Sequence, residues 1–214
     1  MCIRFDHVCT FPGTHEVLLN EFLTHTEKGA DVLDLGCYKG QISIELIKHE
    51  FNVISRDIRD WGHIDKLPNF DILDANKPFS IESNSLDTIY CTEVIEHLDN
   101  AANLIAECQR ILRPGGHMLL SSPNIYSIKS RAQFLLRGTL FGFGSHETSE
   151  WYHVSPLRIE WLRHHCKRVG FEILSINGLP YDRSYGFRQK VFNWLDKMFN
   201  CIPGHTIYFI LQKT

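Results

Sequence analysis

The sequence has no long apolar run and no closely paired cysteines. No stretch of about 18 apolar residues occurs in the chain, so we expect no helix that crosses a membrane. The first residues, MCIRFD, lack the apolar core of a signal peptide, which predicts a chain that is not secreted by its own signal. The seven cysteines are scattered and form no C-x-x-C pair, so we expect reduced thiols that serve mostly in packing. These absences predict a cytoplasmic protein.

The chain also lacks a strong excess of charge of either sign. It carries 22 lysines and arginines against 25 acidic residues, which gives a formal net charge of −3. An extended nucleic-acid surface is therefore not expected. No internal repeat or low-complexity tract is present. An apolar fraction of 43% is normal for a packed protein, and the length of 214 residues suits a single domain over residues 1–214 with insertions.

What the sequence does contain is a short strand pattern that leads into a glycine turn and then into a helical pattern. Residues 32–35 predict the strand, Gly36 and Gly40 bracket the turn, and the helical pattern starts at Gln41. This order places a backbone loop at the carboxyl end of a parallel sheet, where open α/β folds bind ligands. Asp57 ends the next predicted strand, where a carboxylate can accept hydrogen bonds from both vicinal hydroxyls of a ribose.

Strand and helix patterns alternate through the rest of the chain. We expect strands at 32–35, 51–56, 70–73, 86–91, 117–122, 171–176 and 206–211. We expect helices over 14–28, 41–49, 101–112 and 127–136, and one that starts at Ser155–Pro156 and stops at Gly170. Residues 113–116, Arg-Pro-Gly-Gly, are expected to separate the third helix from the next strand. The pattern predicts an α/β fold.

Five pieces of the chain, taken in order, resemble the class I S-adenosylmethionine-dependent methyltransferases, including the type 11 and ubiquinone O-methyltransferase-like members. They are VLDLGCYKG at 32–40, Asp57, Asp74–Ala75, LD at 86–87 before TEVIEHL at 92–98, and ILRPGG at 111–116. The similarity covers a cofactor-binding core at about residues 30–124. It implies a Rossmann-like three-layer sandwich with a seven-stranded, mostly parallel sheet that has one antiparallel strand.

The resemblance also implies which residues hold S-adenosylmethionine. Gly36 and Gly40 would border the methionine and the ribose. Asp57 would bind the ribose hydroxyls, and Asp74 would contact the adenine amino group. Asp34 would support the loop or reach the methionine amine. The remaining cofactor candidates are Cys37, Tyr38, Ala75 and Thr92. The family usually has glycine where this chain has Tyr38, so a positive φ there would be strained, and a tyrosine ring that fills the adenosyl site would contradict the assignment.

Two insertions follow this core. Residues 125–155, which we name the lid, are too long for a simple connection, and residues 125–146 contain basic residues but no acid. Their basic and apolar character suits an anionic or lipid-carrying substrate, with packing on the sheet as the alternative. The second insertion, 178–205, contains an amphipathic helical stretch. Such a stretch can pack on the core, form a dimer interface, or make peripheral contact with the inner face of a membrane.

Catalytic candidates follow from the chemistry of methyl transfer. Transfer from a sulfonium is an in-line displacement, so most of the catalysis is positioning, and a hydroxyl acceptor also needs its proton removed. The lid supplies His153 and His146 as bases near neutral pH. Glu147 and Glu150 are alternatives. A plain surface position in a loop is the competing interpretation for each of these residues.

A metal site is a second mechanism that the sequence leaves open. If the segment after the fourth predicted strand is one helical turn, Glu93 lies on the same face as Glu96 and His97, which follow it by three and four residues. With the distant His153 they could hold Mg²⁺. The run resembles that of the small-RNA 3′-terminal 2′-O-methyltransferases, where a metal faces a vicinal diol, and that of the ubiquinone-biosynthesis O-methyltransferases. Glu-His after this strand is also common in the superfamily without a metal, where it shapes the pocket.

The sequence therefore predicts an S-adenosylmethionine-dependent methyltransferase that acts on a hydroxyl of a small-molecule, sugar or lipid-linked acceptor. One alternative is a metal-assisted 2′-O-type enzyme that acts on a vicinal diol. The other is a non-catalytic binding or scaffold protein that keeps the fold. The residues predict no oligomeric state.

Overall fold

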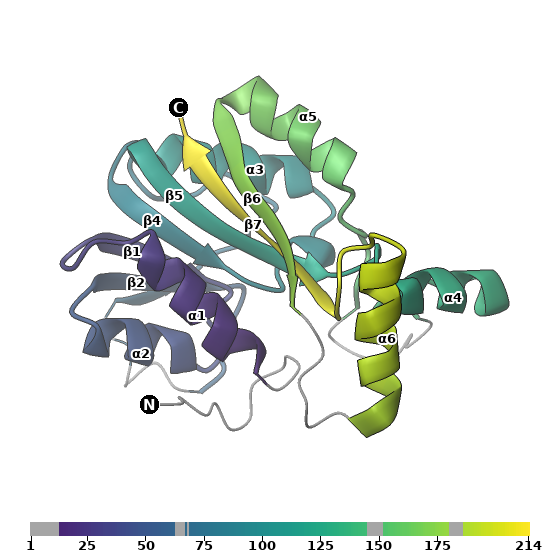
Figure 1. Ribbon diagram of the computed structural model, residues 1–214. Coiled ribbons are helices and arrows are strands. Elements are labelled where there is room, and N and C mark those ends of the chain that lie inside the picture. Colours follow the sequence, from purple (N-terminus) through teal and green to yellow (C-terminus); the bar gives the residue numbers. More distant parts are fainter. Residues whose placement is uncertain (1–12, 63–66, 68, 145–151, 180–185) are drawn as a thin grey trace.

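Helices cover both faces of a seven-stranded sheet in the computed structural model of the protein (Figure 1). The structure describes residues 13–62, 67, 69–144, 152–179 and 186–214. The strands are β1 (Asp31–Leu35), β2 (Asn52–Asp57), β3 (Phe70–Ile72), β4 (Leu86–Cys91), β5 (Leu112–Pro123), β6 (Phe171–Leu179) and β7 (Thr206–Lys213). The helices are α1 (Thr14–Thr24), α2 (Gln41–Lys48), α3 (Ala101–Ile111), α4 (Ile128–Arg137), α5 (Ile159–Val169) and α6 (Gly186–Met198), with a short 3₁₀ helix, η2 (Ile95–His97).

The strand order explains where a ligand can bind. The order is β3-β2-β1-β4-β5-β7-β6, and β7 alone runs antiparallel to its two neighbours. This confirms the predicted three-layer sandwich with one antiparallel strand. From β1 the sheet grows outward through β2 and β3, and from β4 it grows in the opposite direction. The strand order therefore reverses between β1 and β4, and open α/β sheets bind ligands at the carboxyl ends of the strands at such a point.

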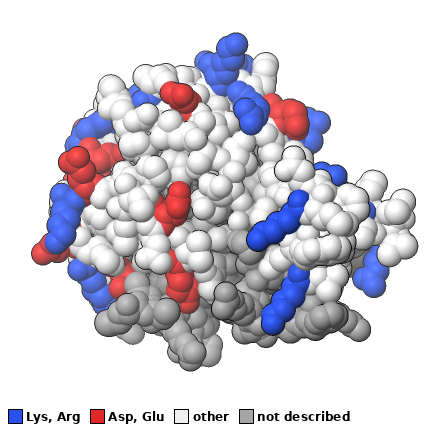
Figure 2. Space-filling model, viewed as in Figure 1, with Lys and Arg blue, Asp and Glu red and all other residues white. Residues whose placement is uncertain are grey.

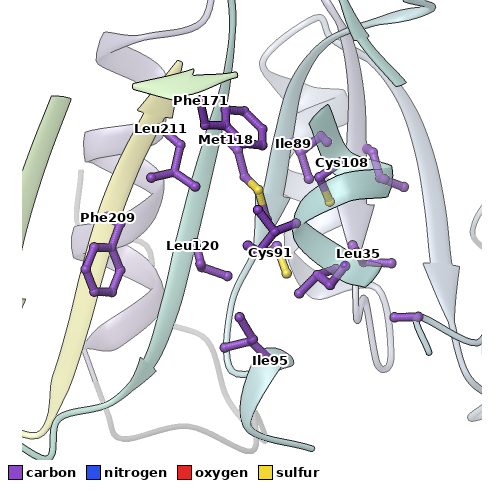
Figure 3. Close-up of a cluster of buried hydrophobic side chains, with 14 of the residues drawn as sticks. Leu35, Ile89, Cys91, Ile95, Cys108, Met118, Leu120, Phe171, Phe209 and Leu211 are labelled. Atoms are coloured by element: carbon purple, nitrogen blue, oxygen red, sulfur yellow. The ribbon is translucent and has the colours of Figure 1, made fainter. Parts of the chain in front are cut away.

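Alternate strand side chains pack against opposite helix layers. Val32 of β1 lies in a buried cluster with residues of α1 and α2, whereas the next residue, Leu33, lies in a cluster with residues of α3 and α5. Figure 3 shows the second cluster, in which Ile89 and Cys91 of β4 lie beside Cys108 of α3. Because both faces of the central strands are buried, their sequences are nearly continuous runs of apolar residues. The described residues contain no helix that is long and apolar enough to cross a membrane.

β5 and β6 are at least three residues longer than the sequence predicted. β5 begins at Leu112 rather than at His117, because Leu112 already pairs with Leu86 of β4. A register irregularity between the two strands accommodates the intervening Arg-Pro-Gly-Gly segment. β6 continues to Leu179, so the second insertion starts after that residue and not at 178.

The predicted start of α5 is wrong, and the reason bears on the site. The helix begins at Ile159 and not at Ser155–Pro156. The Ser155 N–H donates to the carbonyl of Glu96 at 3.0 Å, and its hydroxyl donates to the carbonyl of Leu98 at 3.0 Å. Tertiary bonds to the segment after β4 therefore replace the expected helix cap.

Helices α4 and α6 come from the two insertions and pack against each other at one edge of the molecule (Figure 1). Asp196 of α6 is fully buried, and its carboxylate accepts the backbone N–H of Ile128 at 2.6 Å and that of Gly204 at 3.2 Å. Ile128 is the first residue of α4, and Gly204 lies just before β7. One carboxylate thus holds the lid, the second insertion and the approach to the last strand together.

Replacing Asp196 with alanine should lower the free energy of unfolding by about 1–3 kcal/mol, because two buried N–H groups lose their acceptor. Urea unfolding followed by circular dichroism measures the change. Asp99→Ala, at an exposed position, is the control. Equal stability of the two variants would show that Asp196 does not hold the insertions in place.

Candidate active site

The loop after β1 bends at Gly36, a position that only glycine can occupy. Gly36 has a φ of 78°, and a Cβ atom there would lie 2.3 Å from Cγ2 of Val94, which follows β4. The N–H groups of Gly36 and Cys37 donate to the carbonyl of Arg56 in β2 at 2.8 and 3.2 Å. The loop is therefore fixed between the ends of β2 and β4, where the strand order reverses.

Asp57, the last residue of β2, holds the same loop through its side chain. One carboxylate oxygen accepts the backbone N–H of Tyr38 at 2.8 Å, and the other accepts the indole N–H of Trp61 at 2.9 Å. Only 8% of the residue is exposed. Each carboxylate oxygen has a second lone pair, so Asp57 can still accept two further hydrogen bonds. Its contact with ribose hydroxyls stays a prediction.

Tyr38 adopts the strained backbone that its sequence context suggested. Its φ is 48°, in the left-handed region that non-glycine residues rarely occupy. The ring lies edge-on to Trp61 with 5.0 Å between centroids, and the Arg59 guanidinium lies 3.6 Å from the Trp61 ring centroid. A cavity of about 540 Å³ adjoins these side chains. Tyr38 therefore lines the cavity and does not fill it.

Four predicted cofactor residues line this cavity together: Gly36, Tyr38, Asp57 and Ala75. Val94 and Leu98, from the TEVIEHL piece, line it as well. The wall also contains residues that the sequence did not single out, namely Ile58, Arg59, Trp61, Asn76, Tyr152 and Val154. No motif marks them, because they lie after strand ends on segments whose course depends on tertiary contacts. Only one feature of the sequence could have indicated Trp61. It is an aromatic residue that follows shortly after Asp57, the acid at the end of the second predicted strand.

Asp34 and Asp74 lie outside the cavity wall. Asp34 is buried and accepts the hydroxyl of Ser43, and burial raises its pKa to about 7. It supports the glycine loop from behind. Asp74 accepts the backbone N–H of Asn76 at 3.0 Å and pairs with Lys77 at 3.0 Å. It therefore stabilises its own turn, while Asn76 lines the cavity.

The remaining cofactor candidates are also behind the wall. Cys37 and Thr92 are buried, and burial raises the pKa of the Cys37 thiol far above its ordinary value, so the thiol is unreactive. Gly40 caps the start of α2 with a φ of 76°, and a Cβ there would lie 2.5 Å from a methyl group of Leu67. These residues shape the loop and do not face the cavity.

Glu96, His97 and His153 lie together beside the cavity. Each offers one ligand atom, and these atoms lie within 4.8 Å of one another. The backbone N–H groups of Val154 and Ser155 both donate to the carbonyl of Glu96, at 2.8 and 3.0 Å, which fixes the segment that carries His153 against η2. Three of the four predicted metal candidates are thus brought into one group.

The two imidazoles of this group have defined tautomers. Nδ1 of His97 lies 3.0 Å from the carbonyl oxygen of Tyr152, and Nδ1 of His153 lies 2.6 Å from that of Gly142. Because a carbonyl oxygen can only accept, each Nδ1 carries a proton and each Nε2 keeps a lone pair. Burial lowers the pKa of both rings from the ordinary 6.5, and the neighbouring His97 lowers that of His153 further. Both rings are therefore neutral at pH 7.

Glu96 is fully buried, and neither of its carboxylate oxygens has a hydrogen-bond partner among the described residues. Burial raises its pKa well above the ordinary value, and the nearby Glu93 raises it further. Glu96 also faces the Ser122 hydroxyl and the Glu93 carboxyl group, so a protonated carboxyl beside Glu93 explains its burial as well as a bound ligand would.

Glu93, the fourth metal candidate, is close enough to Glu96 to raise its pKa, but it is not among the three residues whose ligand atoms lie within 4.8 Å of one another. The residue lines the cavity, and its carboxylate accepts the hydroxyl of Ser121 at 3.1 Å. Its φ is 53°, and burial raises its pKa to about 7. Strained backbone and a shifted pKa are both frequent at functional sites. His146, the second predicted base, lies outside the described residues, as do Glu147 and Glu150.

The family model of a methyltransferase domain matches residues 14–176, which is most of the chain. The chain belongs to this methyltransferase family. Its predicted membership of the class I S-adenosylmethionine-dependent methyltransferases is confirmed.

Individual relatives agree with this assignment. A Mycolicibacterium smegmatis protein that is named as an S-adenosylmethionine-dependent methyltransferase is 35% identical over 114 residues, which are 51% of this chain and 44% of the relative. This chain therefore spans less than half of that protein. A ubiquinone biosynthesis O-methyltransferase from Coxiella burnetii is 27% identical over 171 residues, 73% of this chain and 69% of that one. The crystal structure of a SAM-dependent methyltransferase from Archaeoglobus fulgidus superposes with a TM-score of 0.68 at 22% identity, covering 94% of this chain and 95% of the other.

The Trp61 indole should contribute to cofactor affinity through Asp57. Trp61→Phe removes one hydrogen bond to the carboxylate, so we expect S-adenosylmethionine binding to weaken by about 0.5–1.5 kcal/mol, and by about 1.5–3 kcal/mol in Asp57→Ala. Titration calorimetry measures both values. Trp194→Phe, on the surface of α6, should bind like the unmodified protein. An unchanged affinity in Trp61→Phe would mean that the indole does not orient Asp57.

Proposed function

We propose that this chain is an S-adenosylmethionine-dependent methyltransferase that methylates a hydroxyl group of a small-molecule, sugar or lipid-linked acceptor. The observation that carries the proposal is the pair of neutral imidazoles, His97 and His153, beside the cavity that contains the predicted cofactor residues. Their ring centroids are 4.7 Å apart. A hydroxyl acceptor must lose its proton, and an Nε2 lone pair can take it.

The residues of the cavity suit the cofactor. Gly36 borders the cavity without a side chain, and Asp57 has lone pairs for two hydroxyl groups. Apolar side chains such as Ile58 and Leu98 border the same space and can pack on an adenine ring. When bound, the cofactor supplies an electrophilic methyl group on a sulfonium. The chain holds and orients the two reactants and provides the base, which is where most of the rate acceleration of such a displacement arises.

The choice of oxygen as the acceptor atom has support from outside the site. The Coxiella burnetii relative is named an O-methyltransferase, and its similarity covers 73% of this chain, including the η2 segment and the start of the lid. The neutral imidazole of His97 in the cavity wall, with that of His153 beside it, suits an alcohol or phenol because such an acceptor must be deprotonated during transfer. The identity of the acceptor stays a prediction.

His153→Gln should lower kcat by roughly 10²–10⁴-fold without changing the affinity for S-adenosylmethionine, because the base is lost and the cofactor wall is kept. Radiolabelled methyl transfer to a panel of a catechol, a long-chain phenol and a hexose measures kcat, and calorimetry measures affinity. His164→Gln, exposed on α5, is the control. Because burial lowers the pKa of His153, the rate should fall on acidification at a lower pH than the titration of an ordinary imidazole would give.

Two results would contradict the proposal in different ways. Equal rates in His153→Gln and His164→Gln would refute the assignment of the base. The absence of S-adenosylmethionine binding at millimolar ligand would instead favour the non-catalytic scaffold.

A second candidate function is metal-assisted methylation of a vicinal diol, favoured by the buried carboxyl group of Glu96 beside two imidazoles. Glu96, His97 and His153 would hold the ion, since their ligand atoms lie within 4.8 Å of one another and both imidazoles present an Nε2 lone pair. Each Nδ1–H donates to a carbonyl, as is usual for histidines that bind metals. A divalent ion at this position would polarise a hydroxyl group and lower its pKa. His153 would then act as a ligand rather than as the base.

Thermal unfolding tests the metal site without relying on activity. With chelator at pH 7–8, Glu96→Gln should unfold at a higher temperature than the unmodified protein. The raised pKa of Glu96 means that folding disfavours its charged form, so the gain should disappear as the pH falls to 4. Added Mg²⁺, Mn²⁺ or Zn²⁺ should stabilise the unmodified protein and not Glu96→Gln. Glu82→Gln, at an exposed position, serves as the control. Equal stabilisation of all three proteins would exclude a metal at Glu96.

A further inference from the structure

The outer surface of α4 and α6 combines exposed apolar side chains that the sheet does not use. We name this surface the insertion face, after the two insertions that form it. Its apolar members are Phe134, Leu135, Leu136, Val191, Trp194, Met198 and Phe199, all exposed. Leu135 is 85% and Leu136 is 81% exposed, at the end of a helix that projects from the body of the molecule (Figure 1). Core packing therefore does not explain these residues.

The charges of the insertion face are all positive. Arg131 and Arg137 of α4 and Lys190 and Lys197 of α6 are exposed. Residues 125–144 contain no acid, and the one acid among residues 190–200 is the buried Asp196, whose oxygens accept two backbone N–H groups. Figure 2 shows the surface over α4 and α6, at the lower right, in blue and white without red. Elsewhere in the same view, red and blue atoms are mixed.

We propose that the insertion face docks on an anionic lipid surface. Leucine and phenylalanine at the tip of α4 can enter the boundary between head groups and acyl chains, and Trp194 suits the same interface. The arginines and lysines would contact lipid phosphates. A second copy of this chain is a poor occupant, because it would place cations against cations. An anionic surface complements both the charge and the apolar side chains.

The insertion face continues directly into the candidate active site. From the end of α4 the chain runs through residues 138–144, where the Gly142 carbonyl accepts Nδ1–H of His153 at 2.6 Å. The ring of Phe143 lies 5.4 Å from that of His153, centroid to centroid. Docking would thus bring the imidazole side of the site near the membrane, within reach of an amphiphilic acceptor. This last step rests on the proposed function, whereas the docking itself does not.

Vesicle co-sedimentation of the full chain tests the docking. We expect binding to vesicles of phosphatidylcholine with phosphatidylglycerol, at least ten-fold weaker binding to phosphatidylcholine alone, and further loss as salt is raised. Arg131→Ser with Arg137→Ser should weaken binding to anionic vesicles roughly thirty-fold. Leu135→Ser with Leu136→Ser should weaken it at least as much. The matched control is Arg163→Ser with Arg168→Ser, which removes two exposed arginines from α5.

Circular dichroism shows whether each variant is folded, and calorimetry with S-adenosylmethionine separates this proposal from the enzymatic one. Loss of vesicle binding in the α4 variants, with cofactor affinity kept and the α5 control unaffected, supports the docking. Failure of the unmodified protein to bind anionic vesicles, or equal losses in the α4 and α5 variants, would overturn it. So would a dimer in solution that the leucine substitutions dissociate, because the face would then be covered by a second copy.

Discussion

The rest of the site depends on the close approach of two loops, those that follow β1 and β4. Because parallel strands end at the same edge of the sheet, the backbone at Gly36 passes against Val94 with no room for a Cβ. Hydrogen bonds from Gly36 and Cys37 to the carbonyl of Arg56 fix the loop on the other side. The position of Asp57, the course of η2 and the width of the cavity all follow from this arrangement.

Buried carboxyl groups gather at this edge of the sheet, but they do not serve the same purpose. Asp34 accepts the Ser43 hydroxyl and supports the loop, so its burial has a structural explanation. Glu93 faces the cavity in a strained conformation, and Glu96 has no partner among the described residues. Carboxyl groups of this kind reduce stability, and natural proteins keep such features mainly where function requires them. These residues therefore reduce the stability of the fold at the place where we propose that the reaction occurs.

The two insertions are separated by α5 and β6 in sequence, yet they form one structural unit. Asp196 joins the start of α4 to the segment before β7, and α4 packs on α6. The inner side of this unit leads to His153 through Gly142, and its outer side is basic and apolar. A substrate that reaches the site past this unit encounters cations and apolar surface first, which is consistent with an amphiphilic or anionic acceptor.

The sequence by itself determined the layers of the fold and the strand ends that border the cavity. Period-two and period-3.6 patterns are local, and the glycine turn and the acid after β2 are adjacent to the strands that place them. The start of α5 and the full length of β5 escaped prediction, because bonds from Ser155 to Glu96 and pairing of Leu112 with Leu86 decide them. The tertiary structure alone decided that the Trp61 indole donates to Asp57 and that Glu96 is buried beside two imidazoles. It also decided that His97 lies against His153, since contacts across so many residues depend on the packed chain and leave no periodic signal.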